Sequence, residues 1–291
     1  MGFRVVVVSK SAKLDLKIGH LIIRNPEVTK IHISEIAVLI LESTAVSVTS
    51  ALLCELVRKK VKIIFCDEKR NPISEITPYY GSHDNSYKIS MQLKWKEPVK
   101  QMVWTEIITQ KIKKQRDVLL HFDKSDAAEK LTKFLDEIEF YDTTNREGHA
   151  AKVYFNALFG KDFTRGSDNN INSALNYGYS LILSAFNREI VLAGYLTQLG
   201  LFHNNMYNFF NLSCDLMESF RPIIDFQVNT MELKKFEKEE KLELVNLLNK
   251  EIFIDGKNQF LLNAIKIYVK SVFDVLNEEA DTYIKEYRNE L

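Results

Sequence analysis

The 291-residue sequence predicts an α+β protein in which a small N-terminal β-sandwich-like domain precedes a larger, all-α domain. Short stretches rich in Val and Ile, separated by turn-forming residues, fill positions 1–75. Turn formers then gather at 76–90, and from residue 91 onward apolar side chains recur every three or four positions. We therefore expect a β-rich domain over 1–75, a linker over 76–90 and a helical domain over 91–291.

The strands expected in the first domain are short and follow one another closely, which is typical of a small sandwich. One segment, Leu52–Lys60, has the apolar spacing of a helix instead. The expected strands are Val5–Val8, Lys17–Arg24, Lys30–His32, Ala37–Leu41 and Val61–Cys66. Most of this domain is expected to be scaffold.

The helical domain is expected to begin with a long amphipathic helix from Met91 to about His121. Few glycines or prolines interrupt the pattern that follows. The acidic C-terminus, from Glu278 onward, is expected to be a fraying helix end. The further expected helices are Asp126–Ile138, Arg146–Leu158, Ile171–Leu199, Asp215–Thr230, Lys238–Leu248 and Lys257–Asn277.

Cysteine usage and missing motifs argue against several classes of protein. The three cysteines are widely spaced and form no C-x-x-C pair, which argues against a disulfide framework or a zinc ribbon and indicates the cytoplasm. Because no run of eighteen apolar residues occurs, neither a membrane-spanning helix nor a membrane partner is expected. Nucleotide hydrolysis and dinucleotide binding have no visible glycine-rich motif.

Basic residues concentrate in one stretch, although the net charge of the chain is zero. Between Lys88 and Arg116, eight Lys and Arg side chains accompany only two glutamates. Such a stripe can contact the phosphates of nucleic acid, but a solvated helix face would have the same composition, and charge alone does not separate the two. The candidate DNA contacts within the stripe are Lys88, Lys94, Lys111 and Lys114.

Glu147 ends the sequence Thr144-Asn145-Arg146-Glu147, which has the S/T-x-x-E form of a capping box. A capping role alone would explain this glutamate. A glutamate in the first turn of a helix can also face a cleft, so Glu147 remains a candidate ligand as well.

A histidine and two carboxylates form the second group of candidates. His203 follows Gly200, which resembles a helix C-cap, and therefore lies on a connection. Asp215 and Glu218 are three residues apart, so they share one helix face, and they also fit its N-cap and N3 positions. If Glu147 joins them in space, the imidazole and carboxylates suit Mg²⁺ or Mn²⁺ rather than structural zinc, as in enzymes that act on phosphodiesters.

Several segments that are weak signals alone form a highly specific combination in their order along the chain. They are Phe65-Cys66-Asp67 with Pro78-Tyr79-Tyr80-Gly81, Arg146-Glu147-Gly148-His149-Ala150-Ala151 with Tyr154-Phe155, Ile171–Tyr179, Gly200-Leu201-Phe202-His203 and Asn211–Pro222. With these segments the chain resembles, over essentially its whole length, the integrase of CRISPR adaptation, the nuclease subunit that inserts new spacers, in its type II-A version. Ser219 stands where that family usually has proline.

The resemblance implies a metal-dependent catalytic site in the helical domain. The family's metal ligands correspond to Glu147, His203 and Glu218, and its additional acidic site residue corresponds to Asp215. The implied cofactor is Mg²⁺ or Mn²⁺. Arg165, Asn172, Tyr177 and Arg221 complete the candidate DNA contacts, and Tyr79, Tyr80 and Asn176 also match motif positions.

The resemblance also implies partners. Residues 1–75 are expected to serve as the dimerisation scaffold of a homodimer, and two such dimers would clamp a dimer of a small ferredoxin-like adaptation subunit. Double-stranded spacer precursors are the implied substrate and the CRISPR repeat is the implied target. The type II-A version adds the effector nuclease and an accessory DNA-ring protein as partners.

The implied reaction is metal-assisted phosphoryl transfer, in which a 3′-hydroxyl of the spacer precursor attacks a phosphodiester of the repeat. Because one phosphodiester is exchanged for another, no nucleotide cofactor is needed. Two alternatives stay open. One is a metal-dependent endonuclease that uses water, and the other is a non-catalytic DNA-binding scaffold in which the carboxylates only cap helices.

Overall fold

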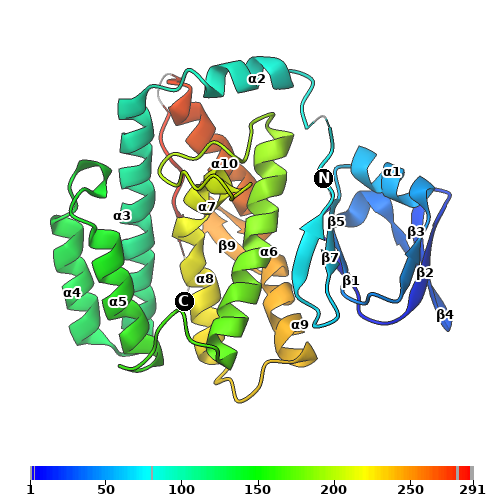
Figure 1. The fold of residues 1–291 in the computed structure, drawn as a ribbon, viewed down its shortest axis with the longest axis horizontal. Coiled ribbons are helices and arrows are strands. Elements are labelled where there is room, and N and C mark those ends of the chain that lie inside the picture. The colour runs from blue at the N-terminus through cyan, green and yellow to red at the C-terminus, as the bar shows by residue number, and fades with distance from the viewer. Residues whose placement is uncertain (1, 3, 80, 280–281, 289–291) are drawn as a thin grey trace.

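The structure, a computed structural model, describes residues 2, 4–79, 81–279 and 282–288, so Tyr80 lies outside the described residues. A β-rich N-terminal part lies beside a mainly helical C-terminal part (Figure 1). The predicted α+β fold class is therefore confirmed. Within the described part of the chain, no helix combines enough length with enough apolar character to cross a bilayer.

Two four-stranded sheets make up the N-terminal part, with strand orders β1-β5-β7-β8 and β4-β3-β2-β6. Side chains of both sheets and of α1 (Ser50–Arg58) share one core that includes Leu14, Leu39 and Leu52, as expected of a sandwich-like domain. The strands are β1 (Arg4–Val8), β2 (Ala12–Lys17), β3 (His20–Asn25), β4 (Glu27–His32), β5 (Ile36–Leu41), β6 (Val46–Val48), β7 (Lys62–Cys66) and β8 (Pro72–Glu75).

The first sheet is mixed rather than built of hairpins alone. Strand β5 pairs in parallel with both β1 and β7, and only β7 and β8 are antiparallel. Helix α1 supplies the crossover that parallel strands such as β5 and β7 require. All six residues of β5 are buried, which explains why its sequence is a continuous apolar run rather than an alternating one.

The segment Lys17–Arg24 is not the single strand that its composition predicts. The chain reverses at Ile18 and Gly19, which both have positive φ, so that Lys17 pairs with His20 across a two-residue turn. The prediction was wrong because Ile18 is unusual in that conformation and hides the turn from a propensity argument.

The C-terminal part is mainly helical but is not all-α. Strands β9 (Glu251–Ile254), β10 (Lys257–Phe260) and β11 (Tyr287–Arg288) form a small sheet. Asp255 and Gly256 make its tight turn with positive φ, a hairpin signal that the predicted helix Lys257–Asn277 overlooked. Its helices are α2 (Asn85–Gln92), α3 (Glu97–His121), α4 (Ser125–Asp136), α5 (Arg146–Phe159), α6 (Asn170–Leu192), α7 (Asn211–Leu216), α8 (Arg221–Thr230), α9 (Lys238–Asn246) and α10 (Leu261–Leu276).

Residues 282–288 do not form the fraying helix end that the sequence predicts. Tyr287 is buried, pairs with Ile254 in the small sheet and donates a hydrogen bond from its hydroxyl to the Ser219 carbonyl at 3.0 Å. The end of the described chain therefore supports the turn that carries Glu218.

Helix α2 begins inside the range predicted as linker and runs two residues past it, since β8 ends at Glu75 and α2 spans Asn85–Gln92. Hydrogen bonds tie the two parts of the chain together across this connection. Glu75 accepts from Ser184 of α6 at 2.7 Å and from Asn187 at 3.2 Å, and Arg188 donates to the Lys60 carbonyl at 3.0 Å. The sandwich therefore rests against α6.

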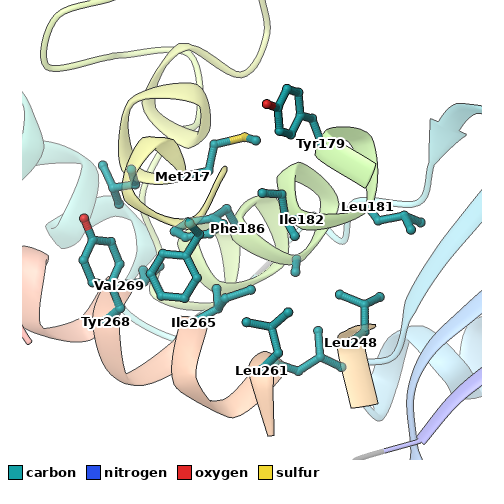
Figure 2. Packing of buried hydrophobic residues seen from close by; sticks show 14 of the residues in the cluster. Tyr179, Leu181, Ile182, Phe186, Met217, Leu248, Leu261, Ile265, Tyr268 and Val269 are labelled. Carbon is teal, nitrogen blue, oxygen red and sulfur yellow. The ribbon is translucent and has the colours of Figure 1, made fainter. Parts of the chain in front are cut away.

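Helix α6 is the centre of the main hydrophobic core. Figure 2 shows Ile182 and Phe186 of α6 with Ile265 and Tyr268 of α10 in this core, and the rings of Phe186 and Tyr268 meet edge to face at 6.1 Å. Helices α3, α4 and α5 share a separate cluster on the opposite side from the sandwich (Figure 1). Because α3 contributes to both cores, it joins the two groups of helices.

Two predicted helix boundaries near the candidate residues are wrong. Helix α6 ends at Leu192, with Gly194 in a positive-φ conformation two residues later, so Gly200 is not its C-cap. The predicted helix Asp215–Thr230 is broken at the 3₁₀ turn Glu218–Phe220, after which α8 begins with a proline in its first turn. Glu218 therefore lies in the short turn that connects α7 to α8.

Candidate active site

Glu147 lies in the first turn of α5 but does not cap it. The N-cap is Asn145, and the carboxylate of Asp142 accepts from the backbone N–H groups of Arg146 and Glu147 at 2.7 and 3.1 Å. The capping box predicted from Thr144 is therefore wrong. Because other side chains satisfy the helix start, the carboxylate of Glu147 is free to point at α3.

Glu218 is buried and shares its two oxygens between two cations. Arg221 Nε donates to Oε1 at 2.9 Å, and Lys111 Nζ donates to Oε2 at 2.6 Å. Burial alone would raise the pKa of Glu218, but Arg221 and Lys111 outweigh it and hold that pKa at about 2. The carboxylate therefore stays ionised at neutral pH.

Lys111 brings the two glutamates together from α3. Its ammonium donates to Glu147 Oε1 as well as to Glu218 Oε2, and only 6% of the residue is exposed. Burial lowers the pKa of Lys111, but the two carboxylates reverse the direction and leave that pKa raised. Carboxylates from α5 and from the 3₁₀ turn thus converge on one cation.

Asp215 holds His203 from a fully buried position inside α7, so its predicted N-cap role is wrong. Its Oδ2 accepts from the backbone N–H groups of Leu201 and Phe202 at 2.6 and 3.0 Å, and its Oδ1 accepts from the His203 N–H at 3.2 Å. Oδ1 also bonds to His203 Nδ1, which raises the pKa of the imidazole. A carboxylate on one ring nitrogen fixes the orientation of the other, Nε2.

Helix α3 also supports the loop of His203 through aromatic contacts. Trp104, which is 2% exposed, stacks in parallel on Phe202 with ring centroids 4.5 Å apart and meets the His203 ring edge-on at 5.8 Å. Trp104 and Lys111 are seven residues apart and share one face of the helix. One face of α3 therefore positions both the imidazole and the two glutamates.

Gly200 permits the close approach between the His203 loop and Asp215. A Cβ at position 200 would lie 2.3 Å from the His203 carbonyl oxygen and 2.7 Å from the Asp215 carboxylate. We expect Gly200→Ala to lower the free energy of unfolding by about 1–3 kcal/mol, measured by urea denaturation. Gly166→Ala is the control, since a Cβ there meets nothing within 4 Å. Equal stability of the two variants would contradict the expectation.

The side chains fit a hard divalent cation chemically, since two glutamates and an oriented imidazole offer oxygen and nitrogen donors. Among the described residues, no three His, Cys, Asp or Glu side chains lie close enough together to hold an ion. The ammonium of Lys111 occupies the position shared by Glu147 and Glu218. His203 also borders a cavity of about 370 Å³ that Trp95, Lys100 and Tyr141 help to line.

A family model described as CRISPR associated protein Cas1 matches residues 5–253. The chain belongs to the Cas1 family. The CRISPR-associated endonuclease Cas1 of Neisseria meningitidis serogroup C (strain 8013) is 35% identical to it over 277 residues, which are 93% of this chain and 91% of that protein.

Two solved structures share the fold. A casposase bound to integration product has a TM-score of 0.77 at 17% identity and aligns with 98% of this chain and 93% of its own. A chain of a Cas6-RT-Cas1–Cas2 complex has a TM-score of 0.73 at 18% identity and aligns with 96% of this chain, which spans 35% of that longer polypeptide. At these identities, both similarities concern the Cas1 fold alone.

Four of the eight predicted DNA contacts are buried in this Cas1-family chain, so little of their side chains is accessible to DNA in this structure. Lys114 pairs with Glu286 at 2.9 Å, and Tyr177 packs against Phe236. The buried residues are Lys111, Lys114, Asn172 and Tyr177. Charge counting fails on α3 because this helix is covered by α4 and α5 on one side and by the main core on the other.

The other four predicted contacts reach the surface to different degrees. Lys94 is exposed and Lys88 is partly exposed. Arg165 is partly exposed, and its guanidinium donates to Asn172 and, at 2.7 Å, to Asn176. Arg221 donates a hydrogen bond to Glu218. It therefore belongs to a cluster of two carboxylates and two cations, formed by Glu147, Glu218, Lys111 and Arg221.

Asp225 is a site-region residue that the sequence-based prediction leaves without a role. It is fully buried behind Arg221, whose guanidinium lies 4.6 Å from the ring centroid of Tyr179, and the Tyr179 hydroxyl donates to Asp225. Burial raises the pKa of Asp225 to about 6. Sequence offers only a weak signal for it, an acidic residue one helical turn after Arg221.

Asp225→Asn is expected to stabilise the protein at alkaline pH. Because the folded-state pKa of Asp225 lies above its unfolded value, ionisation of this carboxyl costs folding free energy as pH rises through about 6. At pH 8 the variant should be more stable by about 1–3 kcal/mol, and the difference should shrink at pH 5. Urea unfolding at both pH values measures it. A gain that does not depend on pH would contradict the assignment.

Proposed function

We propose that this Cas1-family chain is a metal-dependent DNA integrase of CRISPR adaptation, in the type II-A version. It joins the 3′-hydroxyl ends of double-stranded spacer precursors to the CRISPR repeat by transesterification. The observation that carries the proposal is the convergence of Glu147 and Glu218 on one cation position, with His203 anchored by Asp215. The relative that is 35% identical is named an endonuclease, and the casposase of similar fold is bound to an integration product.

The arrangement argues against the alternative of a non-catalytic scaffold. In that alternative the candidate carboxylates only cap helices. In the structure, Asn145 and Asp142 cap α5 instead, and Asp215 lies inside α7. Glu218, moreover, is buried between two cations, which is a costly arrangement for a residue with no task beyond structure.

Glu147, His203 and Glu218 would hold Mg²⁺ or Mn²⁺ in this proposal, and the ion would supply Lewis-acid chemistry at the scissile phosphate and the 3′-hydroxyl. Asp215 keeps His203 in one orientation, which suits the neutral imidazole for a ligand role through Nε2. Asp215 also raises the pKa of the imidazole, which suits the alternative role of proton carrier. Arg221 keeps Glu218 ionised and fixed in place.

The proposed partners follow from the same function. We propose that residues 1–75 mediate a homodimer and that a small ferredoxin-like adaptation subunit joins two dimers, with the effector nuclease and an accessory DNA-ring protein as type II-A partners. One protein of similar fold belongs to a Cas6-RT-Cas1–Cas2 complex, which supports a subunit partner. The cytoplasm is the proposed location, where the chromosomal repeat lies.

The test uses the chain with its adaptation subunit, a plasmid that carries a leader and repeat, and a labelled spacer precursor. Covalently joined DNA should appear with Mn²⁺ and a 3′-hydroxyl precursor, and should disappear with a 3′-deoxy end or with chelator. Cleaved DNA without joined DNA would favour the endonuclease alternative. DNA binding with neither product, unchanged by chelation, would favour the scaffold.

A further inference from the structure

Lys111 lies where an ion shared by Glu147 and Glu218 would have to lie. Its Nζ is 2.6 Å from Glu218 Oε2 and is also bonded to Glu147 Oε1, so it takes one oxygen from each carboxylate. A divalent ion bound by both carboxylates would lie close to this ammonium, and two cations at such short range repel each other strongly. The ammonium and the divalent ion therefore compete for the same place.

The second cation of the cluster is held differently. Arg221 bonds to the other oxygen of Glu218, Oε1, at 2.9 Å, and its guanidinium lies over the Tyr179 ring. Its position therefore leaves Oε2 unaffected. Lys111 ends in a compact ammonium on a flexible four-carbon stem, which can swing aside by rotation about its own bonds. Of these two cations, Lys111 is the one that can leave.

We propose that Lys111 is a tethered counter-cation, which holds Glu147 and Glu218 together until a divalent ion displaces it from them. The inference rests on the proposed function in one respect, the assignment of these glutamates as metal ligands. Lys111 keeps the two carboxylates close without an ion, so the metal meets a preformed pair. The exchange lowers the apparent metal affinity, since each binding event must break two ion pairs.

Isothermal titration with Mn²⁺ of the full chain tests the exchange. Lys111→Met removes the competitor with little change in length, and we expect it to bind Mn²⁺ about tenfold or more tightly than wild type. Lys62→Met is the control, because Lys62 is an equally buried lysine that pairs with Glu75 of the N-terminal part instead. Its Mn²⁺ affinity should stay within about twofold of wild type, because its ion pair lies outside the cluster.

A second readout separates competition from a loss of structure. Without metal, Lys111→Met should melt at a lower temperature than wild type, because two carboxylates lose their shared cation, and saturating Mn²⁺ should raise its melting temperature more than that of wild type. If Lys111→Met does not fold, Lys111→Gln, which still donates a hydrogen bond, is expected to bind Mn²⁺ more tightly as well. Unchanged or weaker Mn²⁺ binding in a folded variant would overturn the inference.

The outcome is independent of the integration assay, because Mn²⁺ titration needs no DNA. Integration by wild type together with an unchanged Mn²⁺ affinity of Lys111→Met would remove the inference and leave the proposed function intact. Tighter Mn²⁺ binding by Lys111→Met, together with no joined DNA from wild type, would support the inference and remove the proposed function.

Discussion

Glu218→Gln is expected to reduce strand transfer by at least about 10³-fold, because ligands of one catalytic ion act as a unit. The amide keeps the shape of the side chain but loses the negative charge that faces Lys111 and Arg221. Binding of the precursor DNA should remain within about twofold, since one neutralised buried acid adds no phosphate contact. Joined product is measured over time, and DNA binding is measured by fluorescence anisotropy on the same preparations.

Glu129→Gln is the control for this substitution. Glu129 is an exposed glutamate of α4 that pairs with Lys133 on the surface, so its loss should leave strand transfer unchanged. The melting temperature of Glu218→Gln must first show that the variant is folded. Strand transfer by the folded variant within tenfold of wild type would remove Glu218 from the set of metal ligands.

Asp215→Ala is expected to lower the free energy of unfolding by about 3–5 kcal/mol, because it leaves buried donors without their acceptor. The carboxylate of Asp215 accepts from three successive backbone N–H groups and from the ring of His203. The loop that carries His203 should therefore open locally. Urea denaturation measures the loss, and amide hydrogen exchange at residues 201–203 should accelerate.

Asp215→Asn is the matched variant, because its amide oxygen still accepts from part of the loop. It should therefore be less destabilised than Asp215→Ala while it still loses strand transfer through a misoriented His203. Unchanged exchange at residues 201–203 in Asp215→Ala would contradict the anchoring role of this carboxylate.

The fold was predictable where one residue pattern dominates. The apolar run of β5 identifies a strand that is buried along its whole length, and the apolar residues that recur every three or four positions identify α3. The hairpin of β2 and β3 was not predictable, since its turn places Ile18 at a positive φ, which β-branched residues rarely adopt. The β9–β10 hairpin carried a readable signal, Asp255-Gly256, between segments too short to stand out from the helices around them.

The site was predictable in its residue types but not in its geometry. Spacing indicates that Asp215 and Glu218 share a helix face, yet the chain bends between them, so Glu218 meets Lys111 and Asp215 turns to the loop of His203. The burial of Lys111 was predictable from the sequence, although counting Lys and Arg residues alone does not reveal it. Lys111 follows the buried Ile107 and Ile108 by one helical turn, so periodicity places it on the apolar face of α3.

The measurement that tests the central claim most directly is a crystal structure of the chain grown with Mn²⁺, with the ion located by anomalous scattering. We predict an anomalous peak bonded to Glu147, Glu218 and the Nε2 of His203, with the Lys111 ammonium moved away from the two carboxylates. A map with no peak between these three side chains at saturating Mn²⁺, with Lys111 still bonded to both glutamates, would contradict the assignment of this site as a metal centre.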